Sequence, residues 1–337
     1  MTFDPNAAAT ADSGIYGLDT SPEAARVILL SAPWEATTSY RTGTAGGPAA
    51  ILAASHQVDL FDLETGRPYE AGIAMIDAPD EVHAWAKEAR ALAEPIIAMG
   101  GVPIGDPRVL PVDALSHKLN EHIYQSAKAW LDKGKLVGLV GGDHSTPFGL
   151  IRAVAEKHPG MGVLHLDAHA DLRKAYEGFS DSHASIMYNV AERLPAVARI
   201  VQVGIRDFGE AEHDYVHASH GRIAQHHDLT LAQARAHGAT WTHLCDAIVA
   251  SLPHEVYLSF DIDGLDPALC PHTGTPVPGG LAWIEVCVLL RAVVDAGRTI
   301  VGFDLNEVAP GPEGDEWDAN VGARLLYKMI GWALRSR

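Results

Sequence analysis

The sequence is poor in cysteine and contains no long apolar run. Its three cysteines, Cys245, Cys270 and Cys287, lie far apart and form no CxxC pair. In a chain long enough to bury a large core, an odd number of separated cysteines favours free thiols in a reducing cytoplasm. No stretch approaches the roughly 20 apolar residues of a membrane span. The polar, small-residue-rich start also lacks the pattern of a signal peptide. We therefore predict a cytoplasmic protein that has no membrane partner.

Positive charge is also scarce. The 25 Lys and Arg residues are outnumbered by 43 Asp and Glu residues, which gives a formal net charge of -18. The sequence contains no cluster of basic residues, which is the feature that nucleic-acid binders use, so we expect no nucleic-acid partner. An acidic protein instead attracts cations. The hydrophobic content of 47% and the charged content of 20% are typical of a globular chain.

Strand and helix patterns alternate along the chain. The apolar patterns predict strands in 25–33, 135–145, 161–171, 198–207, 255–267 and 298–310. They predict helices in 81–97, 116–134, 146–158, 280–297 and 320–337. This order is typical of βαβ units. We expect a doubly wound α/β fold, with a predominantly parallel sheet and helices on both faces. A single catalytic domain would span 15–337, after a flexible segment over 1–14.

Polar residues follow several of the predicted strands at their carboxyl ends. The four such positions are 141–145, 167–171, 261–263 and 304–307. In open α/β sheets, ligand sites lie outside the carboxyl ends of the strands. The four segments could therefore meet in one crevice.

One of these segments, in LHLDAHADL, alternates acids with an imidazole. Asp167, His169 and Asp171 are spaced two residues apart, which in an extended chain places all three on one face. Neighbouring anions repel each other unless a cation lies between them. Taken alone, the segment is equally compatible with a loop of capping aspartates and a histidine that fills space.

Two further segments add similar side chains. GGDHS supplies His144, and SFDIDGLDP supplies Asp261 and Asp263, which would share one face of an extended chain. Asp266 precedes a proline and is expected to begin a turn. Four aspartates in one pocket cannot all stay ionised without compensating charge, and two divalent ions would supply it. Imidazole and carboxylate ligands without a thiolate favour Mn, Ni, Fe or Co over a structural Zn.

The three motifs GGDHS, DAHAD and SFDIDGLDP, in this order, resemble the ureohydrolase family of arginases and agmatinases. HTGTPVPGGL at 272–281 and GARLLYKMI at 322–330 support the resemblance, which covers most of the chain. It implies the doubly wound α/β fold and hydrolysis of a guanidino group to urea and an amine. It also implies an oligomer, either a hexamer or a trimer, in which a paralogous subunit could take part.

The resemblance assigns two divalent ions to six ligands. One ion would take His144, Asp167, Asp171 and Asp261, and the other would take His169, Asp167, Asp261 and Asp263, so that Asp167 and Asp261 bridge. A guanidinium carbon is a poor electrophile, and bound metal makes hydroxide accessible by lowering the pKa of water toward about 7. Asp171 would accept a hydrogen bond from the attacking hydroxide.

The remaining candidates surround this centre. Glu307 resembles the family's guanidinium-binding glutamate, and its alternative is an ordinary loop carboxylate. His183 stands where the family keeps a proton-shuttling histidine for the leaving amine. Trp34, Thr38 and Tyr40 of the first loop are candidates to close the pocket around a small cation.

The substrate is suggested by a departure from arginases. The region 171–189, DLRKAYEGFSDSHASIMYN, lacks their Asn-rich loop. It is similar instead to nickel-dependent guanidine hydrolases, as is CPHTGTPVPGG at 270–280. This similarity implies guanidine, an alkylated guanidine or a biguanide such as metformin as the substrate, with Ni²⁺ favoured and Mn²⁺ the alternative.

Other functions remain open at this point. Guanidinobutyrate and agmatine are alternative substrates, and an inactive scaffold subunit of a hetero-oligomer is an alternative of another class. A deacetylase of the related single-zinc fold is a third, although the two adjacent histidines that such enzymes use near the metal cannot be placed here. Five histidines between 213 and 227 could form a second metal site, but a solvated irregular region is the favoured interpretation.

Overall fold

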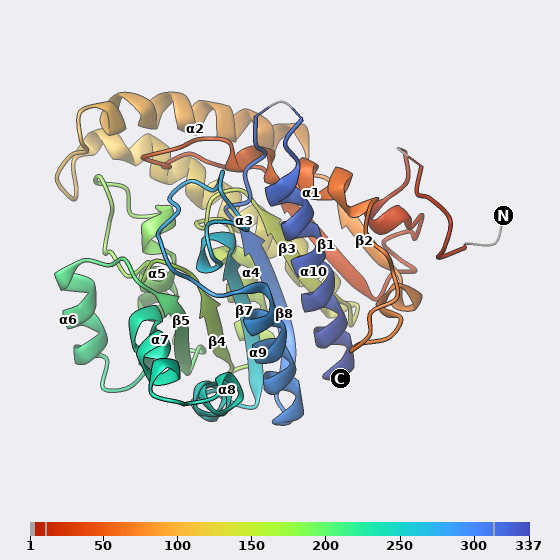
Figure 1. Ribbon diagram of the computed structural model, residues 1–337. Helices are drawn as coiled ribbons and strands as arrows, with labels where there is room; N and C mark the ends of the chain where they lie inside the picture. The colour runs from red at the N-terminus through yellow and green to blue at the C-terminus, as the bar shows by residue number, and fades with distance from the viewer. Residues whose placement is uncertain (1–3, 11, 313) are drawn as a thin grey trace.

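The computed structural model describes residues 4–10, 12–312 and 314–337, and in this part of the chain eight parallel strands form one sheet (Figure 1). The strand order is β2-β1-β3-β8-β7-β4-β5-β6. The strands are β1 (Val27–Ala32), β2 (Ile73–Ile76), β3 (Leu136–Gly141), β4 (Gly162–Leu166), β5 (Arg199–Ile205), β6 (Ile223–His227), β7 (Glu255–Asp261) and β8 (Thr299–Asn306). Every pairing in this sheet is parallel.

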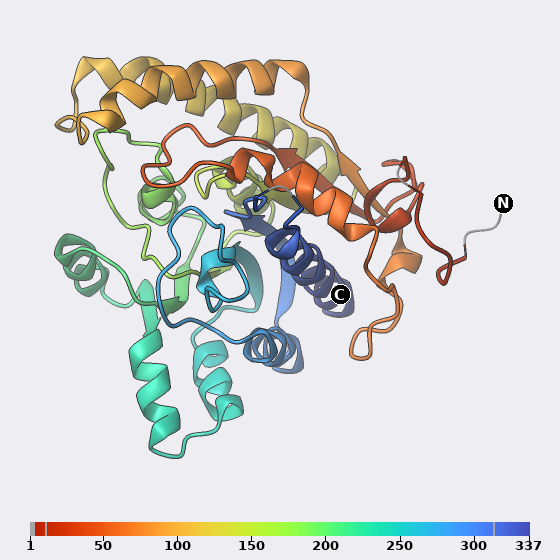
Figure 2. The same cartoon turned by 45° about the horizontal axis from the view of Figure 1, so that its top comes forward.

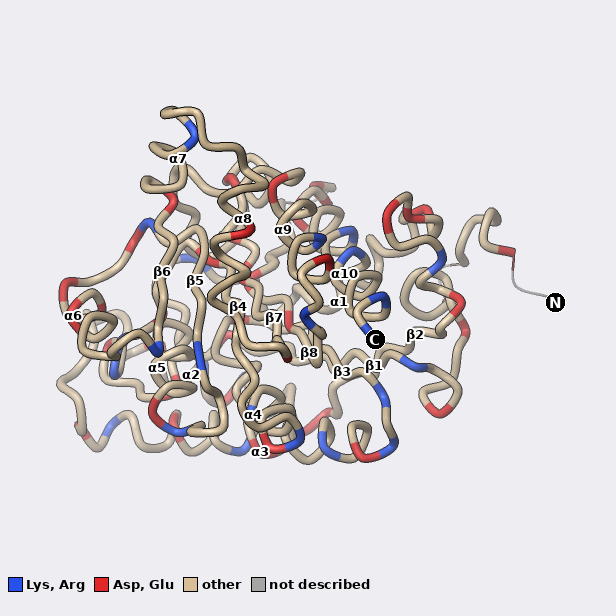
Figure 3. Tube along the Cα trace, turned by 90° about the horizontal axis from the view of Figure 1, so that it is seen from below, with Lys and Arg blue, Asp and Glu red and all other residues tan. Residues whose placement is uncertain are grey.

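Helices cover both faces of the sheet, as the view along it shows (Figure 3). One layer contains α2 (Asp80–Ala98), α3 (Leu110–Asp132), α4 (Phe148–Lys157) and α5 (Ile186–Arg193), in which neighbouring helices are in contact. The opposite layer contains α1 (Gly47–Ser55), α8 (Trp241–Ala250), α9 (Trp283–Asp295) and α10 (Trp317–Arg335). Two further helices, α6 (Glu210–Ala218) and α7 (Asp228–Ala236), flank β6 in sequence.

The core is divided in two by the sheet. Within β1, Val27 and Leu29 belong to one cluster of buried apolar side chains, and Ile28 and Leu30 belong to the other. This alternation follows from the two-residue period of a strand. Because both faces are covered, strands such as LVGLVG of β3 are continuously apolar and fully buried.

The parallel α/β fold predicted from the sequence is confirmed, with differences in detail. The strand expected over 255–267 ends at Asp261, where a 3-10 turn over Ile262–Gly264 begins. The prediction of an irregular region around the five histidines is wrong. Four of them lie in regular elements, at 213 and 217 in α6 and at 226 and 227 in β6, and only the one at 220 lies in the turn between these elements. Of the segment expected to be flexible, residues 1–3 and 11 lie outside the described residues, and the division at residue 14 stays a prediction. None of the helices in the described ranges combines the length and apolar character that crossing a bilayer requires.

Candidate metal centre

The site is built on four adjacent central strands. β3, β8, β7 and β4 are consecutive neighbours in the sheet, and each is followed by one of the four polar segments. Loops 33–46 (red) and 262–282 (light blue) lie over this end of the sheet in Figure 2. Because the strands are parallel, their carboxyl ends share one edge, and residues up to 163 positions apart in sequence come into contact there.

The glycine turn after β3 holds the first candidate ligand in place. Gly142 donates its N–H to the carbonyl of Ala32 at 2.8 Å, and the Asp143 N–H donates to the carbonyl of Trp34 at 2.7 Å. A Cβ atom on Gly142 would collide with the backbone of Trp34. Glycine is therefore required here for close packing, and two residues further on the turn directs His144 into the crevice.

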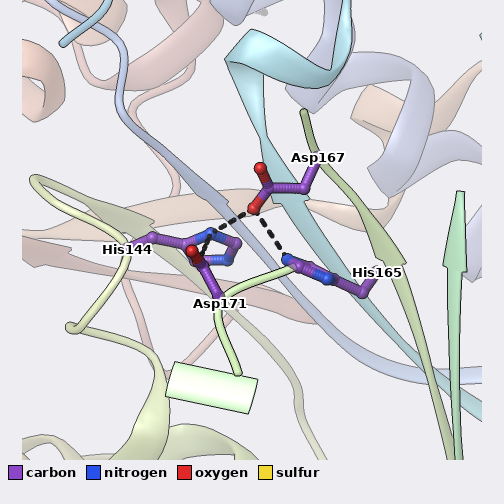
Figure 4. A group of neighbouring side chains, drawn as sticks. All are labelled: His144, His165, Asp167 and Asp171. Carbon is purple, nitrogen blue, oxygen red and sulfur yellow. Dashed lines mark hydrogen bonds and ion pairs between the residues drawn. The ribbon is translucent and has the colours of Figure 1, made fainter. Parts of the chain in front are cut away.

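His144 lies at the centre of a first group of acids (Figure 4). Its Nδ1 is 3.1 Å from Oδ2 of Asp167, 3.3 Å from Oδ2 of Asp171 and 3.3 Å from Oδ2 of Asp261. All four side chains are almost fully buried. Three carboxylates that approach one ring nitrogen form a site for a cation.

A second group shares one of these acids. Nδ1 of His169 lies 3.1 Å from Oδ2 of Asp263 and 3.4 Å from Oδ1 of Asp167. Asp167 therefore presents one oxygen to each group, as a bridging carboxylate would. Asp261 contacts His144 with one oxygen, while its other oxygen accepts the N–H of Asp263 at 2.9 Å. The structure thus brings together all six predicted ligands.

The backbone that achieves this is not the extended chain expected from the sequence. β4 ends at Leu166, and Asp171 has a φ of 53°. Asp263 lies in the 3-10 turn after β7. Glu307 also has a positive φ, 62°. Residues other than glycine rarely adopt this conformation, and such strain concentrates at functional sites. The acids converge because the chain turns sharply beyond each strand.

The buried acids perturb one another electrostatically. Burial and the charge of Asp167 raise the pKa of Asp171 to about 7. Burial together with Asp263 and Asp167 raises the pKa of Asp261 well above its ordinary value. Burial alone would lower the pKa of His144, but the surrounding aspartates outweigh it and raise that pKa well above the usual 6.5. A bound cation would relieve all of these shifts.

The groups behind the ligands also suit a metal site. Nε2 of His144 lies 3.0 Å from Oγ of Ser259, which donates to Oδ1 of Asp304 at 3.0 Å. This contact leaves Nδ1 of His144 free to face a cation, as metal-ligating histidines require. The chemistry and burial of the donor set therefore fit two divalent ions.

His165 was not singled out in the sequence. It is fully buried, and its Nε2 lies 2.8 Å from Oδ2 of Asp167, while its Nδ1 accepts a hydrogen bond from Gln202 at 2.9 Å. Burial lowers the pKa of His165, so the neutral ring donates to Asp167 through Nε2. His165 could have been recognised in the sequence, because it continues the two-residue spacing of Asp167, His169 and Asp171.

A cavity of about 310 Å³ opens over the two groups. Glu307 and His183 both line it. Oε1 of Glu307 accepts the N–H of His144 at 2.8 Å, and burial followed by the charge of Asp143 raises the pKa of Glu307 well above its ordinary value. Burial, and then the charges of His169 and His144, lower the pKa of His183 to about 3, so its ring is neutral at pH 7.

The three candidates from the first loop have different positions. Tyr40 lines the cavity and is 73% exposed. Trp34 is fully buried beneath the glycine turn and does not line the cavity. Thr38 is also buried, and its carbonyl and hydroxyl accept hydrogen bonds from Arg90 of α2 at 2.7 and 3.1 Å. Of the three, only Tyr40 is placed to touch a ligand in this cavity.

The outer wall of the cavity contains residues that sequence reasoning did not assign to it. Arg173 and Tyr176 line it, together with Asp207 and Glu212. Nε of Arg173 lies 3.6 Å from Oε2 of Glu212, and its guanidinium lies over the ring of Tyr176 at 4.8 Å. Both contacts hold a positive charge at the wall of a cavity whose floor is acidic.

Comparisons with known proteins give a family match and a similar solved fold. The model of the arginase family matches residues 25–331. The chain is 35% identical to N(1)-aminopropylagmatine ureohydrolase of Thermus thermophilus, covering 93% of this chain and 92% of the relative. It is 29% identical to guanidinobutyrase of Pseudomonas aeruginosa, covering 91% and 86%. The solved structure of proclavaminate amidinohydrolase from Streptomyces clavuligerus superposes with a TM-score of 0.74, at 24% identity and covering 98% of this chain and all of that one, which supports the fold.

Proposed function

The chain belongs to the arginase family, whose members hydrolyse C–N bonds of linear amidines, and on this basis we propose that it acts on guanidine or on a small alkylated guanidine or biguanide such as metformin. The reaction would release ammonia or an amine, and guanidine would leave urea as the other product. The predicted agmatine and guanidinobutyrate alternatives fall within the same reaction class.

The position of Arg173 on the cavity wall is the main observation that supports this choice of substrate. A guanidinium group that reaches Glu307 and the buried aspartates would leave its substituent near this wall. Arg173 adds a positive charge there that Glu212, 3.6 Å from its Nε, only partly offsets. Tyr40, Pro276 and Val277 offer apolar contacts to a short alkyl group. A substrate with one cationic group and little or no tail therefore suits the cavity best.

The residues of this chain divide the chemistry between them. When bound, two divalent ions held by the six ligands would supply compensating charge and lower the pKa of water, so that a hydroxide is available at neutral pH. Glu307 pairs with the guanidinium and orients its carbon over the centre. Asp171 accepts a hydrogen bond from the nucleophile. The neutral His183 accepts a proton and returns it to the leaving amine.

The metal, the assembly and the location complete the proposal. Nickel is the favoured ion and manganese the alternative, because imidazole and carboxylate ligands suit both. An oligomer, either hexameric or trimeric, is proposed from family resemblance, and a paralogous partner remains part of the proposal. The three cysteines are buried and unpaired, which supports a reducing cytoplasm. Residues 15–337 are proposed to form the catalytic domain.

One observation favours a second candidate, agmatine. The carboxylate of Asp207 also lines the cavity and could pair with the distal ammonium of a diamine tail. Asp207→Asn would then reduce kcat/KM for agmatine and leave the value for guanidine nearly unchanged. An equal effect on both substrates would mean that Asp207 does not select a tail.

A substrate panel tests the proposal. Metal-free protein is loaded separately with Ni²⁺ or Mn²⁺, and guanidine, metformin, 4-guanidinobutyrate, agmatine and arginine are assayed side by side for released urea, ammonia or amine. We expect guanidine or metformin to give the highest kcat/KM, with nickel. Agmatine or arginine as the best substrate, with manganese, would refute this assignment and leave the reaction class intact. No turnover of any guanidine would support an inactive subunit.

A further inference from the structure

Two exposed histidines on α6 form a pair that the proposed reaction does not use. His213 and His217 are one helical turn apart, and their Nε2 atoms lie 3.1 Å from each other. Their ring centroids are 4.4 Å apart. Residues four apart on a helix are neighbours on its surface, but here the two side chains also bring their ligand atoms together.

The spacing of the two nitrogens suits chelation. Bonds from imidazole nitrogen to a metal are about 2.0–2.1 Å long. The two nitrogens are 3.1 Å apart. An ion bound to both at this bond length would therefore have an N–metal–N angle of roughly 95–100°. This angle is compatible with octahedral, square-planar or slightly distorted tetrahedral coordination. Two residues on one rigid helix thus provide adjacent ligand positions, and the remaining positions face solvent.

The surroundings of His213 restrain its ring. Nδ1 of His213 lies 3.7 Å from Oδ1 of Asp214, so a carboxylate adds negative charge beside the ring. The ring of Phe208 lies nearly parallel to that of His213, at 14° and 6.4 Å between centroids. The side chain of His213 is 47% exposed, so an ion can reach it from solvent.

We propose that His213 and His217 form a third metal site, separate from the buried centre and selective for Ni²⁺, Cu²⁺ or Zn²⁺. Imidazole binds these ions more tightly than Mn²⁺, in the order of divalent-metal affinities. The net charge of -18 raises the local concentration of any cation. This site does not depend on the proposed substrate.

The site is connected to the active cavity through its helix. Glu212, next to His213 on α6, lines that cavity and accepts the N–H of Leu172 at 2.9 Å. Leu172 directly follows Asp171. An ion that bridges one turn of α6 therefore stabilises the helix that supports this part of the cavity wall.

The test counts metal on the folded protein. Wild-type protein is loaded with Mn²⁺ at the buried centre and then dialysed against Ni²⁺, and the sum of Mn and Ni is measured. His217→Ala and His213→Ala are compared with His243→Ala, which removes an exposed histidine from α8 whose fourth residue along is Ala247. We expect wild type and His243→Ala to bind about one more equivalent than either α6 variant. The affinity at this site should fall ~10-fold or more in the α6 variants.

Amide hydrogen exchange distinguishes binding at the two histidines of α6 from non-specific binding elsewhere on the surface. Ni²⁺ should slow amide hydrogen exchange in 210–218 of wild type and of His243→Ala but not of His217→Ala. The reason is that chelation links two side chains one turn apart and so stabilises the helix. The same metal sum in all four proteins would overturn the proposal. Unchanged exchange in α6 of the nickel-loaded wild type would also overturn it.

Discussion

Glu307→Gln is the sharpest test of how the substrate is held. The substitution removes one negative charge and keeps an oxygen that can accept the His144 N–H, which Oε1 of Glu307 now accepts at 2.8 Å. Because burial raises the pKa of Glu307, ionised glutamate is unfavourable before a cation arrives. The neutral amide should therefore fold at least as well, and the metal ligands should stay in place.

The magnitude follows from the burial of this side chain. Glu307 is 5% exposed, so water screens its interaction with a guanidinium poorly. At an effective dielectric constant of about 20, two unit charges ~4 Å apart attract by roughly 4 kcal/mol. The amide would keep a neutral hydrogen bond worth about 1 kcal/mol. The cost of ionising the buried glutamate reduces the attraction, so the net loss is at most about 3 kcal/mol, or roughly 10²-fold in kcat/KM, since each 1.4 kcal/mol is about tenfold.

The assay measures urea release from guanidine by metal-reconstituted protein, with metal content determined on the same samples. Asp266→Asn is the matched control, because the Asp266 carboxylate accepts the N–H of Ala268 at 2.8 Å in the turn after the site, and an amide oxygen can accept the same bond. We expect a large loss of kcat/KM in Glu307→Gln at unchanged metal content. A loss of less than about threefold would show that Glu307 does not pair with the substrate.

Three further predictions concern the metal, the proton and the pH. Asp261→Ala should lower the metal content at both positions, because Asp261 is the proposed second bridge, whereas Asp266→Ala should bind as much as wild type; equal content in both variants would contradict the ligand assignment. His183→Ala should slow turnover ~10²–10⁴-fold with little loss of metal, and an unchanged rate at neutral pH would show that the proton comes from elsewhere. In metal-free protein, burial raises the pKa of Asp171 to about 7, and the aspartates around His144 raise the pKa of His144 well above 6.5. Above pH 6.5 the folded state therefore binds more protons than the unfolded chain. Stability is then lost as pH rises, and the melting temperature should fall between pH 6.5 and 8; bound metal should remove most of this fall, and an identical slope with and without metal would refute the electrostatic account.

Some features of this protein follow from the sequence alone. Continuous apolar runs such as LVGLVG predict buried parallel strands, because only strands covered on both faces exclude water from every side chain. Segments that place acids and histidines directly after such runs predict a site at one edge of the sheet. Both inferences rest on local patterns. The six candidate ligands follow from these patterns, and the structure brings them together.

Other features depend on contacts between distant segments. Short or polar elements such as β2 and β6 have no distinctive local pattern, so only their sheet neighbours define them as strands. Trp34 resembles a pocket residue in the sequence, yet the backbone of the glycine turn after β3 packs against it and buries it. His165 became part of the site only because Gln202, 37 residues away, fixes which nitrogen faces Asp167.

The geometry of the acids was likewise decided by the tertiary structure. Asp171 and Glu307 adopt left-handed backbone conformations that local preference disfavours. The surrounding contacts hold these conformations, such as the Glu307 N–H that donates to the carbonyl of Gly142 at 2.8 Å. The sequence by itself determined which side chains could bind cations and between which strands they lie. Their distances, burial and charge coupling arose only when four strand ends were brought to one edge, because electrostatic interactions depend on separation in space and on exclusion of water.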